Sequence, residues 1–150
     1  MRKLLSKFLC IVFLAYSLPG ISDDAQNPGI SNYIANIELH TSAELLSVLM
    51  RVDDHFVNGD LVSGVGEPVA FVLHGAEAHS LKRENYQQNK VMVDLAAKLT
   101  AFGVIDVKVC ERWMGNNRID VDQLQPFVGT VSSGPAEQRR LKKELHYVEF

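Results

Sequence analysis

The strongest constraint on the fold is an alternation of short apolar runs with segments of helical period. Residues 68–73 form a continuous apolar run, as expected for a strand covered on both faces. Residues 104–110 form a second strand-like run, and residues 83–102 between them repeat apolar side chains at helical spacing before ending at Gly103. Alternating strands and helices joined by short links predict a parallel sheet with right-handed connections and helices on both faces.

The rest of the chain continues this alternation. The spacing of Thr41 and Glu44 predicts a capping box at a helix start, and that of Asp120 and Gln123 predicts another. The further predicted elements are, in chain order, a strand at 33–39, a helix at 41–56, a short helix at 120–124, a strand at 127–131, a helix at 136–145 and an edge strand at 147–150. The predicted fold class is α/β, with three layers and a mostly parallel, Rossmann-like sheet of about five strands.

The N-terminus has the pattern of an export signal. Three basic residues precede an apolar stretch at 8–18, which is shorter than the roughly 20 residues needed to span a bilayer. Gly20 and Ser22 suit cleavage before Asp23, and a cut after Ser17 is the alternative. An uncleaved membrane anchor is the other interpretation. Cys10 lies inside the apolar stretch and does not begin a lipoprotein cleavage box.

These features divide the chain into three parts. We predict a signal peptide at 1–22, a flexible mature N-terminus at 23–32 and a single domain at 33–150, exported to the bacterial periplasm. Removing residues 1–22, which contain three basic and no acidic residues, changes the formal net charge from −3 to −6. An acidic surface argues against nucleic acid or anionic lipid as a partner. We expect no stable membrane insertion after cleavage.

The mature chain keeps one cysteine, Cys110, and so cannot form an internal disulfide. Cys110 is the last residue of the predicted strand 104–110. In open parallel sheets, ligands bind next to this carboxyl end of the strands. Free backbone N–H groups there, and a cation such as Arg112 or Arg118, would favour the thiolate, which is the reactive species. The alternative is a small buried apolar side chain that continues the strand.

Other residues near the predicted strand ends are candidates for binding. His74 closes the strand 68–73 and is a candidate partner of Cys110, although a structural histidine is the alternative. Ser133, at a predicted helix start, could help to hold a small anion. Glu77 and His79 follow His74, but their spacing matches no strong metal pattern, so we predict no metal site. The chain contains no phosphate-binding glycine loop, nucleophile elbow or Cys-x-x-Cys, and we expect no cofactor.

In the order of its motifs, residues 34–150 resemble the DsrE/DsrF-like family of small α/β sulfur-handling proteins. The motifs that carry the resemblance are Val72-Leu73-His74-Gly75, Val107-Lys108-Val109-Cys110, Val121-Asp122-Gln123-Leu124-Gln125-Pro126, Val131-Ser132-Ser133-Gly134-Pro135-Ala136-Glu137 and His146-Tyr147-Val148. The resemblance implies homo- or hetero-oligomers, often trimers or hexamers. It also implies that Cys110 receives sulfane sulfur as a persulfide.

We therefore expect an exported sulfur carrier of the sulfurtransferase type, assembled as a homo-oligomer and working with a sulfur donor or acceptor protein or a small thiol. Cys110 is the expected sulfur acceptor and His74 its partner. The expected ligand-binding residues are Gly75, Arg112, Arg118 and Ser133. The alternatives are a non-catalytic module that binds a small ligand and a subunit that only builds an oligomer.

Overall fold

The computed structural model of the protein describes residues 32–150. The predicted signal peptide, its cleavage sites and residues 23–31 of the predicted flexible N-terminus lie outside the described residues. The five strands form one sheet in the order β4-β3-β2-β1-β5, and every neighbouring pair is parallel. The strands are β1 (Tyr33–Ile34), β2 (Val69–Leu73), β3 (Ile105–Cys110), β4 (Gly129–Val131) and β5 (Val148–Glu149). This confirms the predicted α/β fold.

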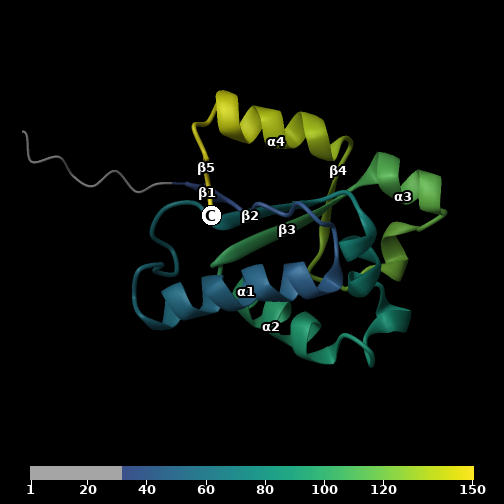
Figure 1. The fold of residues 1–150 in the computed structure, drawn as a ribbon, viewed down its shortest axis with the longest axis horizontal. Helices are drawn as coiled ribbons and strands as arrows, with labels where there is room; N and C mark the ends of the chain where they lie inside the picture. Colours follow the sequence, from purple (N-terminus) through teal and green to yellow (C-terminus); the bar gives the residue numbers. More distant parts are fainter. Residues whose placement is uncertain (1–31) are drawn as a thin grey trace, which may run out of the picture.

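The helices form the two outer layers (Figure 1). Helices α1 (Ser42–Val57) and α2 (Lys90–Ala101) cover one face of the sheet, and α4 (Gly134–Lys143) alone covers the other. Helix α3 (Glu111–Asn117) follows β3 directly. Three 3-10 turns complete the fold: η1 (Ala76–Leu81), η2 (Arg83–Asn85) and η3 (Val121–Gln123).

The two faces of the sheet are buried unequally. All five residues of β2 are buried, because this central strand has helices on both sides. In β3, the alternate residues Ile105, Val107 and Val109 are buried in the large core under α1 and α2. Asp106 and Lys108 point to the opposite face and are only half-buried. The α4 side holds a smaller core of Ile34, Ala70, Val72 and Leu141.

The first strand is shorter than predicted because a helix carboxylate binds the chain that follows it. Strand β1 ends at Ile34, and the backbone N–H groups of Glu38 and Leu39 both donate to the Glu44 carboxylate at 2.8 Å. Burial raises the pKa of Glu44, but these hydrogen bonds stabilise the carboxylate and keep the pKa below its ordinary value. The Thr41 hydroxyl accepts from the Glu44 N–H at 3.2 Å, so half of the predicted capping box is present.

The predicted helix at 83–102 is also shorter, since α2 starts only at Lys90 and the preceding residues form η1 and η2. Helix α3 is an addition that the sequence pattern did not predict. The second predicted capping box, Asp120 with Gln123, is confirmed at η3, where the Asp120 N–H donates to Gln123 Oε1 at 2.8 Å.

The C-terminal residues pack mostly within the chain. The ring of Phe150 lies edge-on to Tyr33 and His55, with centroid distances of 5.5 and 5.4 Å. Tyr147 packs against the small core under α4, while Val148 in β5 stays exposed. Tyr147 and Phe150 are therefore half-buried within the chain, whereas Leu145 and Val148 remain exposed.

Candidate functional site

The carboxyl ends of β2 and β3 bring His74 and Cys110 together. The two strands pair in register through Leu73 and Val109, so the next residues of each strand are neighbours on the α4 face. Gly134, the first residue of α4, packs against both. A Cβ added at Gly134 would lie 3.1 Å from Cβ and Cδ2 of His74 and 3.2 Å from Cβ of Cys110. The N-terminus of α4 is therefore in contact with this pair.

Cys110 is a free cysteine, and the residue is 3 % exposed. It is nevertheless not part of either apolar cluster. Its neighbours are His74, which directly follows β2, Val131 on β4 and Gly134 on α4. Cys110 also occupies the N-cap position of α3. The cysteine is therefore a buried residue at the carboxyl end of β3, next to a histidine and outside the two apolar clusters.

A fully buried carboxylate, Glu77, lies beside this pair on η1. Its Oε1 accepts from the backbone N–H groups of His74 and Gly75, both at 3.0 Å. Its Oε2 accepts from Nδ1 of His40 at 3.1 Å. A buried charge needs such partners, since leaving it unpaired costs several kcal/mol. Glu77 therefore fixes the turn after β2 and joins it to the loop that precedes α1.

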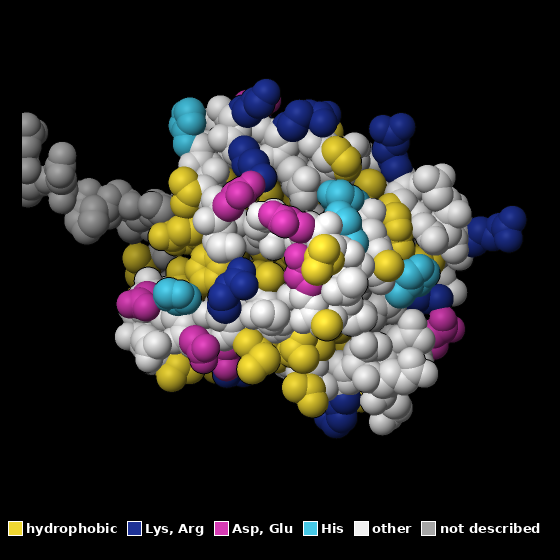
Figure 2. Space-filling view, viewed as in Figure 1, with side chains coloured by type: hydrophobic (Ala, Val, Ile, Leu, Met, Phe, Trp, Pro, Cys, Tyr) yellow, Lys and Arg dark blue, Asp and Glu magenta, His cyan; other side chains and the backbone are white. Residues whose placement is uncertain are grey.

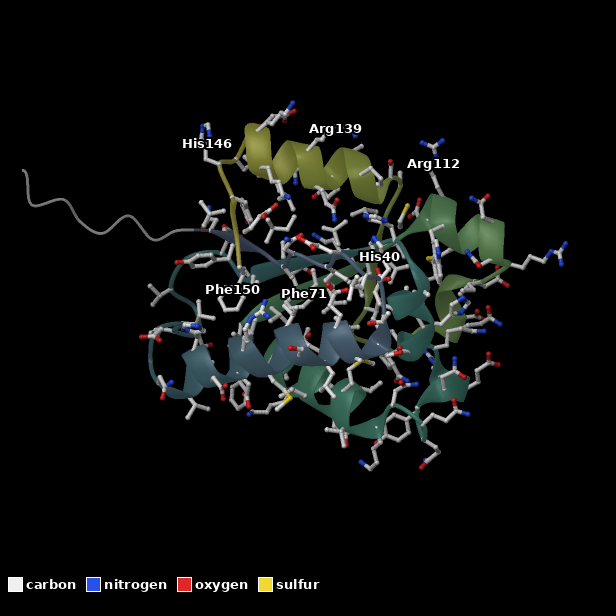
Figure 3. All side chains as sticks on the ribbon, viewed as in Figure 1. His40, Phe71, Arg112, Arg139, His146 and Phe150 are labelled. Carbon is white, nitrogen blue, oxygen red and sulfur yellow. The ribbon has the colours of Figure 1, made fainter. Side chains whose placement is uncertain are left out.

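His40, which no sequence motif marks as a site residue, reaches the site from the loop before α1. Its ring centroid lies 4.7 Å from that of His74 (Figure 3). Its backbone is in the left-handed region, with φ of 52°. The only sequence signal for it is its position just before the helix cap Thr41, at the carboxyl side of the first predicted strand.

Gly75 is required here because the backbone passes close to two side chains. A Cβ at Gly75 would lie 2.5 Å from Cβ and Cγ of His40 and 2.6 Å from Oε2 of Glu77. The structure therefore places this predicted ligand-binding residue in contact with His40 and Glu77, where it leaves space for their pairing.

The other predicted site residues form no hydrogen bond or ring contact with His40, His74, Glu77 or Cys110, although Ser133 directly precedes Gly134. Arg112 on α3 and Arg118, the C-cap of that helix, are exposed, and Figure 3 shows Arg112 extending away from His40. Ser133 is the N-cap of α4, and its side chain makes no capping hydrogen bond. The ring of His79 packs edge-on against Trp113, 4.9 Å between centroids. No group of three or more potential ligands within residues 32–150 could hold a metal ion.

A separate cavity of about 370 Å³ lies between α4 and the sheet, with charged side chains around it (Figure 2). Lys108 pairs with Asp106 at 2.6 Å and Arg140 with Glu137 at 2.7 Å. Arg140 keeps the pKa of Glu137 below its ordinary value. Neither Cys110 nor a histidine lines this cavity. The protein therefore has two distinct polar regions, one at the sheet edge and one under α4.

These features define a three-layer α/β protein with an all-parallel sheet and a cysteine–histidine cluster at its carboxyl edge. No family model and no curated protein matches the chain. Among solved structures, it is similar to a protein of unknown function from Methanobacterium thermoautotrophicum, with a TM-score of 0.57 and 19 % sequence identity over 80 % of this chain and 95 % of that one. This likeness shows the fold alone. Between residues 32 and 150, no helix is both long and apolar enough to cross a membrane.

Proposed function

We propose that the protein is a sulfur carrier that accepts sulfane sulfur on Cys110 as a persulfide and passes it to another thiol. The observation that carries the proposal is the placement of Cys110 and His74 at neighbouring strand ends, where both lie next to the N-terminus of α4 at the carboxyl edge of the sheet. Parallel sheets bind ligands at this edge, and helix N-termini favour anions. A thiolate and a persulfide are both anions that suit such a site.

The proposed step balances without an added oxidant. Cys110 gives its proton to His74, and the thiolate attacks the outer sulfur of a donor persulfide, R–S–SH. A new S–S bond forms on Cys110 as the donor's S–S bond breaks. The donor leaves as the thiolate R–S⁻, which takes from His74 the proton that Cys110 had given up. Cys110 then carries the persulfide S–SH. Transfer to an acceptor thiol is the reverse of this step with a second molecule.

The test is intact-mass analysis of the full chain after treatment with polysulfide. The chain has two cysteines, Cys10 and Cys110, which provide a matched pair of variants. Cys10→Ser should gain one sulfur atom that a reducing thiol removes, and the double variant Cys10→Ser/Cys110→Ser should gain none. Sulfur uptake by Cys110 only after denaturant is added would contradict the proposal.

The second candidate is a module that binds a small ligand without covalent chemistry. The exposure of Cys110, only 3 %, favours it, because little of this residue is accessible to a reagent. If the native thiol resists alkylation and Cys110→Ser unfolds the protein, Cys110 is a core residue. The binding-module function then replaces the sulfur carrier.

Export and assembly belong to the same proposal. The basic residues and short apolar stretch at the N-terminus support export, and N-terminal sequencing of secreted protein should find a start near Asp23. A homo-oligomer, a trimer or hexamer, is supported by the family resemblance and by the exposed Val148 on edge strand β5. Sedimentation at micromolar concentration tests it, and a monomer alone would count against it.

A further inference from the structure

The proposed sulfur chemistry uses Cys110 and His74 but leaves two adjacent ionisable groups without a role. Glu77 is fully buried, and His40 connects it to the ring of His74. The residues belong to separate parts of the chain: His40 precedes α1, while Glu77 lies on η1, 37 positions later. Their pairing is therefore a product of the tertiary structure.

The hydrogen bonds of Glu77 determine which nitrogen of His40 carries a hydrogen. A carboxylate only accepts hydrogen bonds. Oε1 is occupied by two backbone N–H groups, and Oε2 faces Nδ1 of His40 at 3.1 Å. Nδ1 is therefore the donor, and Nε2 is the nitrogen left to accept a proton. A carboxylate that orients an imidazole in this way also stabilises the imidazolium when it forms.

The placement of His40 is over-determined and strained. Its backbone has φ of 52°, a conformation that residues other than glycine rarely adopt. The Glu44 carboxylate holds the two N–H groups just before it, and Gly75 provides the space for its ring. Strained backbone that several contacts maintain is concentrated at functional sites. About one third of the His40 side chain is exposed, at 32 %, so it can exchange protons with water.

We infer that Glu77 and His40 form a carboxylate–imidazole pair that carries protons between the Cys110–His74 pair and solvent. His74 takes the proton of the Cys110 thiol, His40 Nε2 accepts it next to the His74 ring, and water receives it. The same route returns a proton to the leaving thiolate. Glu77 is a positioning residue that acts through His40. This inference deepens the proposed sulfur chemistry and rests on it for its biological meaning.

The test measures the rate of Cys110 alkylation by iodoacetamide as a function of pH in the full chain carrying Cys10→Ser. Glu77→Gln would donate its amide N–H to Nδ1 of His40 and so place the hydrogen on Nε2. Iodoacetamide reacts with the thiolate, and this variant and His40→Gln both remove the carboxylate–imidazole pair that accepts the thiol proton, so each should lower the rate near neutral pH by about tenfold. They should also change the shape of the pH profile.

Two further variants keep the result interpretable. His40→Gly suits the left-handed backbone, and added imidazole should restore its rate. His55→Gln is the matched control, because His55 also pairs with a carboxylate, Asp60, at 2.9 Å, but away from Cys110. It should keep the wild-type rate and pH profile.

The outcomes separate the two proposals. If folded His40→Gln and His40→Gly keep the wild-type rate and profile, the proton-carrying pair is wrong, even if sulfur uptake on Cys110 stands. If alkylation depends on His40 but polysulfide never adds sulfur, the pair stands and the sulfur carrier is wrong. If the native thiol does not react at all, both are wrong.

Discussion

Two buried or half-buried acidic residues, Glu77 and Glu137, show how differently the two polar regions are built. Glu77 at the sheet edge has no exposed surface and binds two backbone N–H groups and His40. Glu137 under α4 has a side chain that is 16 % exposed and pairs with Arg140, one turn along the same helix. The first carboxylate joins distant segments of the chain, whereas the second makes a local contact. The site at the carboxyl ends of β2 and β3 should therefore be rigid and sensitive to substitution. The cavity under α4 should tolerate substitution better.

The largest expected effect is that of Glu77→Leu. This change leaves the N–H groups of His74 and Gly75 without their buried acceptor and frees His40. We expect unfolding free energy to fall by about 3 kcal/mol, the cost of orphaned buried donors together with a lost charged partner. Urea unfolding measures it. A loss no larger than that of Glu137→Leu would remove the distinction between the two regions.

Gly75→Ala should be the next most damaging change. The added Cβ would approach His40 at 2.5 Å, so the His40 loop must move. We expect a loss of about 2 kcal/mol, typical of an overpacked site. Gly115→Ala is the matched control, since a Cβ there has open space on helix α3 and should stabilise the protein by about 0.5 kcal/mol through helix propensity. Equal thermal stability of the two variants would show that the His40 loop moves at little cost in free energy.

Gly134→Ala tests the contact between α4 and the Cys110–His74 pair. Its Cβ would be 3.1–3.2 Å from both residues, which is tight but not prohibitive. Better helix propensity offsets part of the crowding, so we expect a net stability change within about 1 kcal/mol. Alkylation of Cys110 should slow, because the added methyl group occupies its surroundings. A faster reaction would mean that the reagent approaches from another side.

The smallest effect is expected from Glu137→Gln under α4. Arg140 lowers the pKa of Glu137 in the folded protein, so the pair stabilises the fold above the ordinary carboxyl pKa of 4.5. This contribution is lost as the pH falls through the lower folded pKa. We expect about 0.5 kcal/mol at neutral pH, as for other half-exposed ion pairs. The difference from wild type should shrink below pH 4.5 in acid titrations of stability, and a constant difference would refute this account.

The sequence by itself determined the layers of this protein. The apolar run at 69–73 and the alternation at 105–110 are local patterns, and they match β2 and β3 because burial imposes its period directly on the strand. Together they also placed His74 and Cys110 at the same edge, since strands in a parallel sheet end together.

Only the tertiary structure decided what surrounds the thiol. The pairing of His40 with Glu77, the burial of Cys110 and the exposure of Arg112 have no periodic signature. His40 meets Glu77 because Glu44 holds the loop before α1 and Gly75 leaves room for the ring, and each contact joins residues from different elements. Local patterns record which side of an element is buried, but such contacts depend on how the elements pack, and that information is not present in any one segment.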